Sequence, residues 1–540
     1  MNKNSILKIC VVIFFASYLI IGLLVYKDYG ISTDEVIQRH HGLVSAKYIT
    51  SFFNEYKAEE LFPRVPNIQD YAFKSYGVVF HLPLTFLEKS LSLEDPRDIW
   101  LLRHLCTFLF FYVGTIFFFL LAKQRFNSTL LGLLSVTILV ISPRIFADSF
   151  YNIKDGVFIS AFIISLYFMI KSIETNKVFY IVLFSLSAAF ATNIRIIAII
   201  LPVLYPFFIL MKKDISNIVK EKRDYTIKLY FFGLLYILLV FAFWPASWAN
   251  PISMVWETIS LKANFPWGGH IMYMGNQIKG TETPWHYIPI WIFITTPILY
   301  TIFFIFSMGR HIKLATNFLL KRKSIYSLMD NKSWQDLIFA TILFLPVVLA
   351  IILNSTLYNG WRHFYFIYPV FIIFSVSGVS VLYNYLSDHK LSLCNYLKYF
   401  VVLIVFIQIT IATKWMQQNH PHQNVYFSSA VDLFGKREGF ERDYWQLSLK
   451  QALEWLLANK KGELHIVVHD HYNHPEQSSY ILKINDRKRI HIYKDIKHNS
   501  SSIYLISTHR DEIPNEHKHK KLHSITVDNL PIVSIFKVNI

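Results

Sequence analysis

Two adjacent carboxylates, Asp34 and Glu35, follow closely on the first apolar stretch of the chain. An acidic pair this close to a bilayer is costly to keep ionised unless it has water, partners or a task. At the level of the headgroups a carboxylate stays hydrated and still reaches a substrate whose tail lies in lipid. The pair is therefore a candidate catalytic centre for a lipid-anchored substrate. Alternatively, Ser32 or Thr33 caps an interfacial helix whose first turn favours acidic residues.

A second group of charges lies between two apolar stretches, in the segment from Pro143 to Asp155. It contains two acids, Asp148 and Asp155, and two bases, Arg144 and Lys154. A short loop brings such charges to the mouth of a helix bundle, where they can act on a substrate. Alternatively, the two bases anchor the loop in the membrane interface and the acids are their counter-ions.

A third group pairs Arg362 with His363 at the start of an apolar stretch. The guanidinium offers a fixed charge and forked donors that suit a phosphate. Alternatively, these residues begin an aromatic-belt helix with a snorkelling arginine. Arg103 and Arg195 allow the same two interpretations. Arg195 lies deeper in the apolar pattern, so it requires a counter-ion or a different helix boundary.

Two further segments have suggestive residue types. Trp285 and His286 lie in a loop rich in tryptophan, where aromatic faces can hold a sugar ring, although aromatic residues also gather at every membrane interface. In the C-terminal part, His469-Asp470-His471 with His474 has the residue types of a metal site. The alternative is a solvated loop, because histidines are scattered through this part of the chain.

The elements that position these residues are mainly membrane helices. Of the 540 residues, 54% are hydrophobic and 16% charged, which exceeds what one soluble core could bury. Eleven apolar stretches are long enough to span a bilayer. They fall at 9–26, 105–122, 128–143, 156–170, 178–194, 196–211, 229–248, 287–308, 337–353, 364–386 and 399–413. The first stretch is followed by no small-residue cleavage site and is kept as a helix.

The basic residues indicate which side each connection faces. With the N-terminus in the cytoplasm, the even-numbered connections are cytoplasmic, and these carry clustered lysines and arginines. The outer face then receives the first loop (27–100), the loop before Asp155, the loop 248–286 and the turn 354–363. The candidate groups therefore share one face of the membrane. The net charge of +17 is explained by this bias, which argues against nucleic-acid binding.

Two regions outside the spans have predictable structure. Within the first loop, 36–53 and 77–91 are predicted to be interfacial amphipathic helices. Residues 415–540 are predicted to form an extracytoplasmic soluble α/β domain, with a helix at 445–459 and strands at 464–468, 489–493, 503–507 and 532–538. Residues 1–414 form the transmembrane module. Cys10, Cys106 and Cys394 give no disulfide framework.

In combination, these motifs resemble the GT-C membrane glycosyltransferases, in particular bacterial relatives of the protein O-mannosyltransferases (glycosyltransferase family 39) and of the lipid A aminoarabinose transferase. The resemblance rests on the order of the motifs and their common membrane face. They are Ser32-Thr33-Asp34-Glu35, Tyr76-Gly77 with His81-Leu82-Pro83, Arg103, the run from Pro143 to Asp155, Pro284-Trp285-His286-Tyr287, Gly360-Trp361-Arg362-His363-Phe364, Asp443-Tyr444-Trp445-Gln446-Leu447-Ser448 and Glu454-Trp455-Leu456. The fold class expected is thus a polytopic α-helical membrane protein of GT-C type with about 11 transmembrane helices and a small C-terminal soluble α/β domain.

The resemblance implies transfer of a sugar, with inversion, from a polyprenyl-phosphate carrier to an acceptor on the outer face of the bacterial cytoplasmic membrane. The acceptor is a protein, lipid A or a glycan. The catalytic candidates are Asp34 as general base, Glu35 as its orienting neighbour and Asp148 as a second acid. The candidate phosphate ligands are Arg362, His363, Arg103, Arg144 and Lys154, and the candidate substrate-shaping residues are His81, Asp155, Trp285 and His286.

The acids are compatible with a divalent metal ion but do not require one. The expected partners are the lipid-linked donor, the acceptor and membrane lipids. A transporter or flippase for lipid-linked saccharides is the alternative function. It would be expected to show internal repeats and ionisable groups near the middle of the membrane. The sequence shows no repeat, which favours an enzyme.

Overall fold

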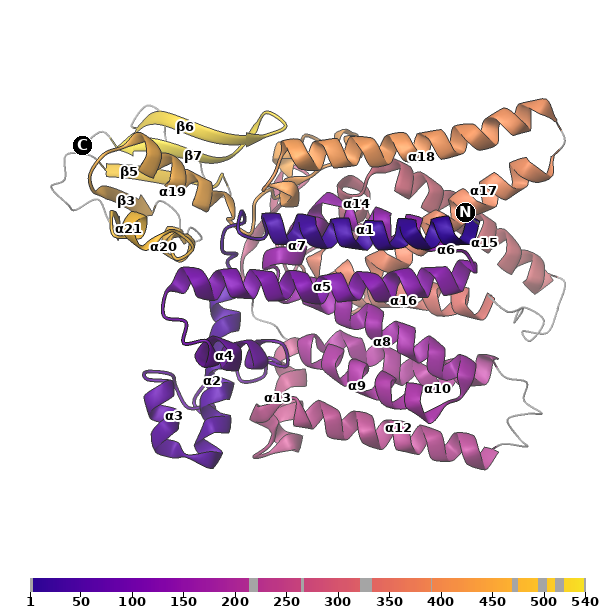
Figure 1. The fold of residues 1–540 in the computed structure, drawn as a ribbon, viewed down its shortest axis with the longest axis horizontal. Helices are drawn as coiled ribbons and strands as arrows, with labels where there is room; N and C mark the ends of the chain where they lie inside the picture. The colour runs from indigo at the N-terminus through magenta and orange to yellow at the C-terminus, as the bar shows by residue number, and fades with distance from the viewer. Residues whose placement is uncertain are drawn as a thin grey trace.

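The computed structural model describes residues 3–212, 222–263, 267–320, 333–389, 391–468, 474–493, 503–509 and 519–538. Long helices run side by side along the longest axis of the molecule, and a sheet with its own helices lies at one end (Figure 1). Helices α2, α3, α4 and α13 lie at the same end. The sheet and the helices outside the bundle therefore lie at the same end of the helix bundle.

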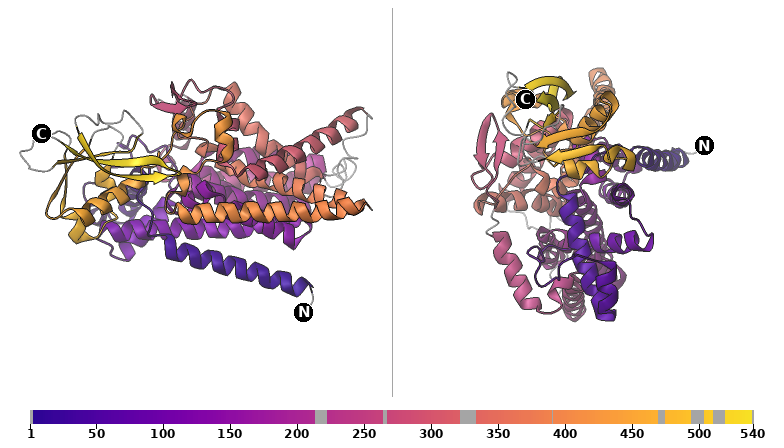
Figure 2. Two further views of the ribbon diagram at one scale, coloured as in Figure 1. Left: turned by 90° about the horizontal axis from the view of Figure 1, so that it is seen from above. Right: turned by 90° about the vertical axis from the view of Figure 1, so that its left-hand side faces the viewer.

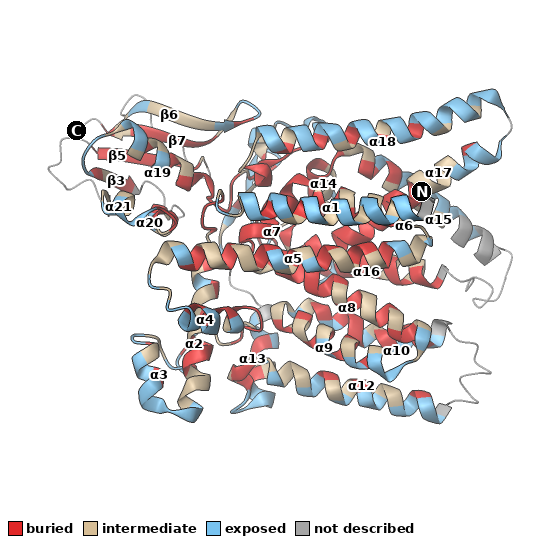
Figure 3. Ribbon diagram, viewed as in Figure 1, coloured by how far each residue is buried: buried red, intermediate tan, exposed pale blue. Residues whose placement is uncertain are grey.

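Seven described helices are long and apolar enough to cross a membrane. They are α1 (Lys3–Val25), α5 (Pro96–Phe126), α8 (Asp155–Thr175), α12 (Lys222–Ala242), α16 (Ser333–Ile352), α17 (Tyr368–Asp388) and α18 (Ser392–Gln418). The apolar windows of α8 and α17 are 78% buried, whereas those of α1, α12 and α18 are only 17% buried. Figure 3 shows α8 mostly red inside the bundle and α1 and α18 largely pale blue. Such apolar, exposed helices suit lipid contact.

The remaining predicted spans coincide with shorter or broken helices. Helix α6 (Thr129–Val140) is bent by 70° against α7 (Pro143–Tyr151). Helices α9 (Val178–Ile194) and α10 (Ile200–Lys212) are short, with a 3-10 turn, η1 (Ile196–Ile199), between them. Helix α14 (Tyr287–Thr295) is separated from α15 (Ile298–Leu320) at Pro297. A proline is tolerated in the first turn of a helix but interrupts a longer one. The predicted helical membrane fold is confirmed. Against eleven predicted spans, seven described helices are long and apolar enough to cross a membrane, or eight if the bent pair α6–α7 counts as one span.

The first loop folds into helices that cover the end of the bundle. They are α2 (Glu35–Phe53), α3 (Glu55–Leu61) and α4 (His81–Ser90), so both helices predicted in this loop are confirmed. Helices α2 and α4 cross at Gly42, where a Cβ atom would lie 2.6 Å from the Thr85 hydroxyl and 2.9 Å from the carbonyl oxygen of His81. A residue without a side chain is needed for this close approach.

The loop before α14 contains a hairpin that the sequence analysis did not predict. A helix, α13 (Pro251–Ala263), precedes two short antiparallel strands, β1 (His270–Tyr273) and β2 (Asn276–Lys279). Met274 and Gly275 form the turn with φ values of 51° and 83°. Positive φ at both central residues is typical of the tight turns that fit the twist of a hairpin.

The C-terminal part is an α/β unit, as predicted. Its mixed sheet has the order β4-β3-β5-β7-β6, with β3 (Leu464–Val468) parallel to β4 (Ile490–Tyr493) and β5 (Ile503–Ser507). Strand β7 (Leu530–Val538) is antiparallel to β5 and to β6 (His519–Val527). Helix α19 (Ser448–Asn459) packs on this sheet, and α20 (Pro475–Ser479) and α21 (Ile484–Arg487) complete the unit. Figure 2 shows the sheet from two further directions.

The sheet unit and the bundle have separate cores. The core of the sheet unit begins at Leu449, whereas Phe427, Phe440 and Trp445 belong to the core of the bundle. The chain between them forms the 3-10 turns η5 (Gln423–Val425), η6 (Ser429–Leu433) and η7 (Arg437–Gly439). This connecting segment therefore builds part of the end of the bundle. All three cysteines lie in the described part of the chain and are free.

Candidate active site

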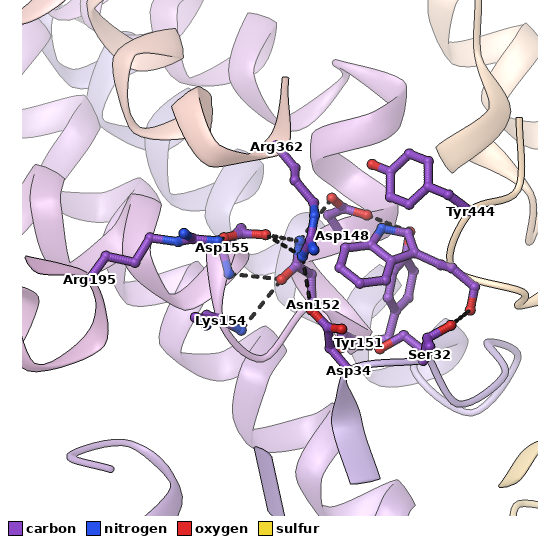
Figure 4. Close-up of polar contacts among 12 residues, drawn as sticks. Ser32, Asp34, Asp148, Tyr151, Asn152, Lys154, Asp155, Arg195, Arg362 and Tyr444 are labelled. Carbon is purple, nitrogen blue, oxygen red and sulfur yellow. Dashed lines mark hydrogen bonds and ion pairs between the residues drawn. The ribbon is translucent and has the colours of Figure 1, made fainter. Parts of the chain in front are cut away.

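Segments that are far apart in the sequence meet where the bundle joins the sheet unit. They are the start of α2, the end of α7, the start of α8, the residue after α9, the turn η4 (Arg362–Ile367) and the chain before α19. Figure 4 shows the polar side chains that these segments contribute. Asp34, Asp148, Lys154, Asp155 and Arg362, predicted from separate loops, lie together here.

Asp34 precedes α2 but does not cap it. Within the described residues its side chain makes no capping hydrogen bond. Its Oδ2 instead accepts a hydrogen bond from Nη1 of Arg362 at 2.9 Å. The side chain of Asp34 is 33% exposed, whereas that of Arg362 is 3% exposed. A buried cation therefore orients a carboxylate that remains open to a substrate.

Glu35, the first residue of α2, braces the turn before the helix. Its Oε2 accepts the backbone N–H of Ser32 at 2.6 Å, and the carbonyl of Ser32 accepts the N–H of Glu35 at 3.1 Å. Glu35 is fully buried, and its Oε1 lies 3.0 Å from Nε2 of His104. The alternative of a helix cap by Ser32 or Thr33 does not describe the start of α2, where no side-chain capping bond is found among the described residues and both hydroxyls donate to the carbonyls of Tyr151 and Trp445.

Asp155, the first residue of α8, binds two arginines. Its Oδ1 forms an ion pair with Arg195, and its Oδ2 lies 3.2 Å from the same Nη1 of Arg362 that binds Asp34. Arg195 therefore has the counter-ion that its place in the apolar pattern required, and it lies immediately after the end of α9. Because a buried charge without a partner is very unfavourable, these ion pairs hold α8, α9 and η4 together.

Asp148 lies deeper, on the bent helix α7. Its Oδ1 accepts a hydrogen bond from the hydroxyl of Tyr151 at 2.5 Å, and its Oδ2 accepts one from the amide of Asn152 at 3.1 Å. The same amide lies 3.4 Å from Oδ2 of Asp155, and Oδ1 of Asn152 accepts the N–H of Asp155 at 2.8 Å. Asn152 therefore links the two acids of this segment.

Lys154 lies beside Tyr76 at the edge of a cavity. Its Nζ is 4.3 Å from the centre of the Tyr76 ring. Burial raises the pKa of Tyr76 to about 12, so this phenol is no base at neutral pH. The cavity has a volume of about 370 Å³ and also borders Arg195. Most of its wall is apolar and comes from η1, α12 and α13, including Ile197, Tyr236, Ile237, Val240, Phe241 and Ile259, with Trp244 just after α12.

The other predicted phosphate ligands have different surroundings. Arg103 is fully buried and forms an ion pair with Glu88 of α4. Arg144 donates from Nε to the carbonyl of Tyr426 at 2.9 Å, and its guanidinium lies 4.8 Å from the ring centre of Phe427. Neither arginine is among the residues that line the cavity. His363 lies close to the network, with its ring edge-on to Tyr358 at 4.7 Å.

The predicted substrate-shaping residues also divide into two groups. His81 is buried at the start of α4, where burial and the charge of Arg103 hold its pKa well below the usual value. It is therefore uncharged at neutral pH. His286 hydrogen-bonds through Nδ1 to the hydroxyl of Tyr273 in β1 at 2.7 Å, and the exposed Trp285 packs edge-on against His286. His286 thus packs on the hairpin, and Trp285 packs on His286.

No group of three or more His, Cys, Asp or Glu residues in the described part of the chain has the arrangement of a metal site. Asp34 and Asp155 face the same nitrogen of Arg362, so a cation of the protein already occupies the space between these two carboxylates. Residues 469–471, the histidine-rich segment weighed as a metal site or a solvated loop, lie outside the described residues.

The sequence analysis missed two residues that complete the site. The buried ring of Trp445 lies 4.7 Å from the guanidinium carbon of Arg362, and its carbonyl accepts hydrogen bonds from the N–H and the hydroxyl of Thr33, both at 3.3 Å. His104 holds Glu35 from α5. The position of Trp445 in the run Asp443-Tyr444-Trp445 was the only signal for the first. A histidine next to an arginine within an apolar stretch was the signal for the second.

The comparisons with known proteins agree with the class that the motifs indicated. Residues 97–248 match the family described as dolichyl-phosphate-mannose-protein mannosyltransferase. The matched region runs from the start of α5 to Trp248, and it contains Asp148, Lys154, Asp155 and Arg195. The resemblance to GT-C membrane glycosyltransferases is confirmed for this region.

Among solved structures, the chain is similar to ArnT from Cupriavidus metallidurans, determined in a crystal bound to undecaprenyl phosphate. The sequence identity is 11% and the TM-score is 0.47, with 98% of this chain and 97% of that chain covered. No curated protein sequence matches the chain.

Proposed function

We propose that the protein is an inverting glycosyltransferase that uses a polyprenyl-phosphate-linked sugar and acts on the outer face of the cytoplasmic membrane. The observation that carries the proposal is the cavity beside Lys154 and Arg195. A polyprenyl phosphate is a long apolar chain with one anionic head. A mostly apolar wall with two cations at the edge of the polar network has the matching chemistry.

The polar network supports the same reaction. The acceptor hydroxyl attacks the anomeric carbon, and its proton passes to the carboxylate of Asp34, which Arg362 orients. The bond between the anomeric carbon and the phosphate oxygen breaks, and the electron pair leaves with the polyprenyl phosphate. Negative charge therefore grows on the phosphate in an oxocarbenium-like transition state. Lys154 and Arg195 are placed to stabilise that charge more than the ground state.

The roles of the other predicted residues follow from their places. Arg362 orients Asp34 and Asp155. We therefore assign it first to positioning the general base and only second to binding the donor phosphate. Asp155 fixes the two arginines. Asp148 lies behind Asn152 and helps to hold the segment that carries Lys154.

The first test measures sugar transfer by the reconstituted full-length chain from a labelled polyprenyl-phosphate sugar. The Asp34→Asn variant keeps the shape of the side chain but removes the base, so kcat is expected to fall by about 10²- to 10⁴-fold. Asp70→Asn, an exposed acid in the same loop, is the control and is expected to behave as the wild type. Near-normal transfer by Asp34→Asn would rule out the base assignment. Movement of an intact lipid-linked sugar across vesicles, without transfer, would favour the transporter alternative.

The second test concerns the donor. Lys154→Ala is expected to weaken binding of polyprenyl phosphate roughly tenfold, because one charge-assisted contact is lost. The control is Lys74→Ala, which removes an outer lysine that does not line the cavity. Equal affinities of Lys154→Ala and the control variant for polyprenyl phosphate would show that the donor does not bind at this cavity.

A further inference from the structure

A buried pair of side chains, Glu35 and His104, holds the turn that carries Asp34. Glu35 turns back on its own chain, with Oε2 on the N–H of Ser32 at 2.6 Å and Oε1 on Nε2 of His104 at 3.0 Å. Both side chains of this pair are 0% exposed. A buried carboxylate that lost its donor would leave the unfavourable site and turn toward water. The position of Glu35, and with it the turn, therefore depends on His104.

Two neighbouring residues of helix α5 hold two helices of the first loop, α4 and α2. Arg103 forms its ion pair with Glu88 of α4, and His104 contacts Glu35 of α2. Nδ1 of His104 is buried without a partner among the described residues. Nε2 faces the Glu35 carboxylate, which accepts hydrogen bonds, so we assign a proton to Nε2. His104 is thus a donor to Glu35.

The remaining contacts of the turn leave Asp34 as its only side chain directed at the polar network. The hydroxyl of Ser32 donates to the carbonyl of Tyr151 at 3.3 Å, and Thr33 binds the carbonyl of Trp445. Asp34 then meets Arg362 at 2.9 Å. A small rotation of the turn would change this contact before it changed the shape of the donor cavity, which none of these turn residues lines.

We infer that His104 is a positioning residue that aligns the proposed base: it holds Glu35, Glu35 holds the Ser32 amide, and the turn thereby presents Asp34 to Arg362 and the acceptor. The effect on catalysis rests on the proposed function. The effect on the turn does not. His104 directly precedes the predicted span 105–122, and only its place beside Arg103 pointed to it in the sequence.

Two substitutions, His104→Gln and His104→Asn, test whether the hydrogen-bond donor must lie at the position of Nε2 or whether any polar side chain is sufficient. The amide nitrogen of glutamine can reach the place of Nε2, whereas that of asparagine lies nearer the place of Nδ1. Thr107→Val is the control on the same buried part of α5, because the Thr107 hydroxyl bonds only to its own helix, at the carbonyl of Arg103.

The first measurement is the steady-state kinetics of the reconstituted chain with a polyprenyl-phosphate sugar. His104→Asn is expected to lower kcat about 10- to 100-fold with the KM for the donor changed less than about twofold. His104→Gln is expected to recover most of the loss, and Thr107→Val to match the wild type. Wild-type kcat in His104→Asn, a loss confined to donor KM, or equal loss in the two His104 variants would overturn the inference.

The second measurement is hydrogen exchange of the backbone amides of residues 30–36, which needs no activity. His104→Asn is expected to exchange faster in this segment, and His104→Gln is expected to exchange at the wild-type rate. Unchanged exchange in His104→Asn would overturn the positioning role even if activity fell. If the wild type transferred no sugar while the exchange pattern held, the proposed function alone would fail.

Discussion

At the scale of single residues, the site depends on a division of labour between neighbours. Glu35 holds the backbone N–H of Ser32, and Asp34 keeps its carboxylate for Arg362. Asp155 is the point where the cations converge, because Arg195 and Arg362 both bind it. With a side chain only 1% exposed, it compensates charges that water cannot reach.

The buried position of Asp155 gives a prediction about stability. Asp155→Asn removes the carboxylate from two arginines, so the free energy of unfolding is expected to fall by about 3–5 kcal/mol. Asp224→Asn breaks the ion pair with Lys228, in which Asp224 is 52% exposed, and is expected to cost less than about 1 kcal/mol. Thermal unfolding of both purified variants in the same detergent measures the difference. Equal midpoints would show that the buried network adds no more than a surface pair.

At the scale of elements, the site is made by the ends of helices and by breaks between them. The 70° bend between α6 and α7 turns the chain across the end of the bundle, so that Asp148 and Asn152 point into it. The end of α9 brings Arg195, and the loop around Gly77 crosses it closely. A Cβ atom on Gly77 would collide with the carbonyl oxygen of Asn193. Both residues line the cavity proposed to bind the donor.

This crossing predicts opposite outcomes for two glycines. Gly77→Ala pushes the loop away from α9 and deforms the cavity, so transfer from the polyprenyl donor is expected to fall about tenfold or more. Gly233→Ala, within α12, meets no atom of the described residues within 4 Å and is expected to retain activity. Binding of polyprenyl phosphate and sugar transfer by both variants provide the measurement. Unaltered donor binding in Gly77→Ala would contradict the importance of the close crossing.

At the scale of the whole molecule, the first loop and the C-terminal part build one site between them. Lys450 of α19 donates to the carbonyls of Lys27 and Asp28, both at 2.8 Å. Gly30 packs under the carbonyl of Leu447, which would lie 2.7 Å from a Cβ atom at this position. Trp445 covers Arg362. The chain from 443 to 450 thus clamps the segment 27–33 that leads to the proposed base.

The sequence predicted elements well and partnerships poorly, for a physical reason. Apolar stretches and alternation report local burial, so strands β3 and β5 were predicted at their observed bounds and the apolar centres of the long helices were found, whereas helix ends and the break between α14 and α15 were not. Strand β6 was missed because its histidines and lysines, such as Lys520 and Lys521, hide the pattern at the edge of the sheet. The contact of Asp34 with Arg362 spans 328 positions in the sequence. Topology placed both residues on one face, but only packing shows that they touch.

The clamp gives a prediction for the whole molecule. Lys450→Met keeps the buried methylene chain but removes both hydrogen bonds to the first loop, so the turn before Asp34 loses a support. We expect kcat to fall several-fold and cleavage by a protease between the bundle and the sheet unit to become faster, because burying the two carbonyls unpaired favours separation of these segments. Lys461→Met, an exposed lysine after the same helix, is the control. If Lys450→Met and Lys461→Met were cleaved at equal rates and both kept full activity, the C-terminal part would not support the turn before Asp34.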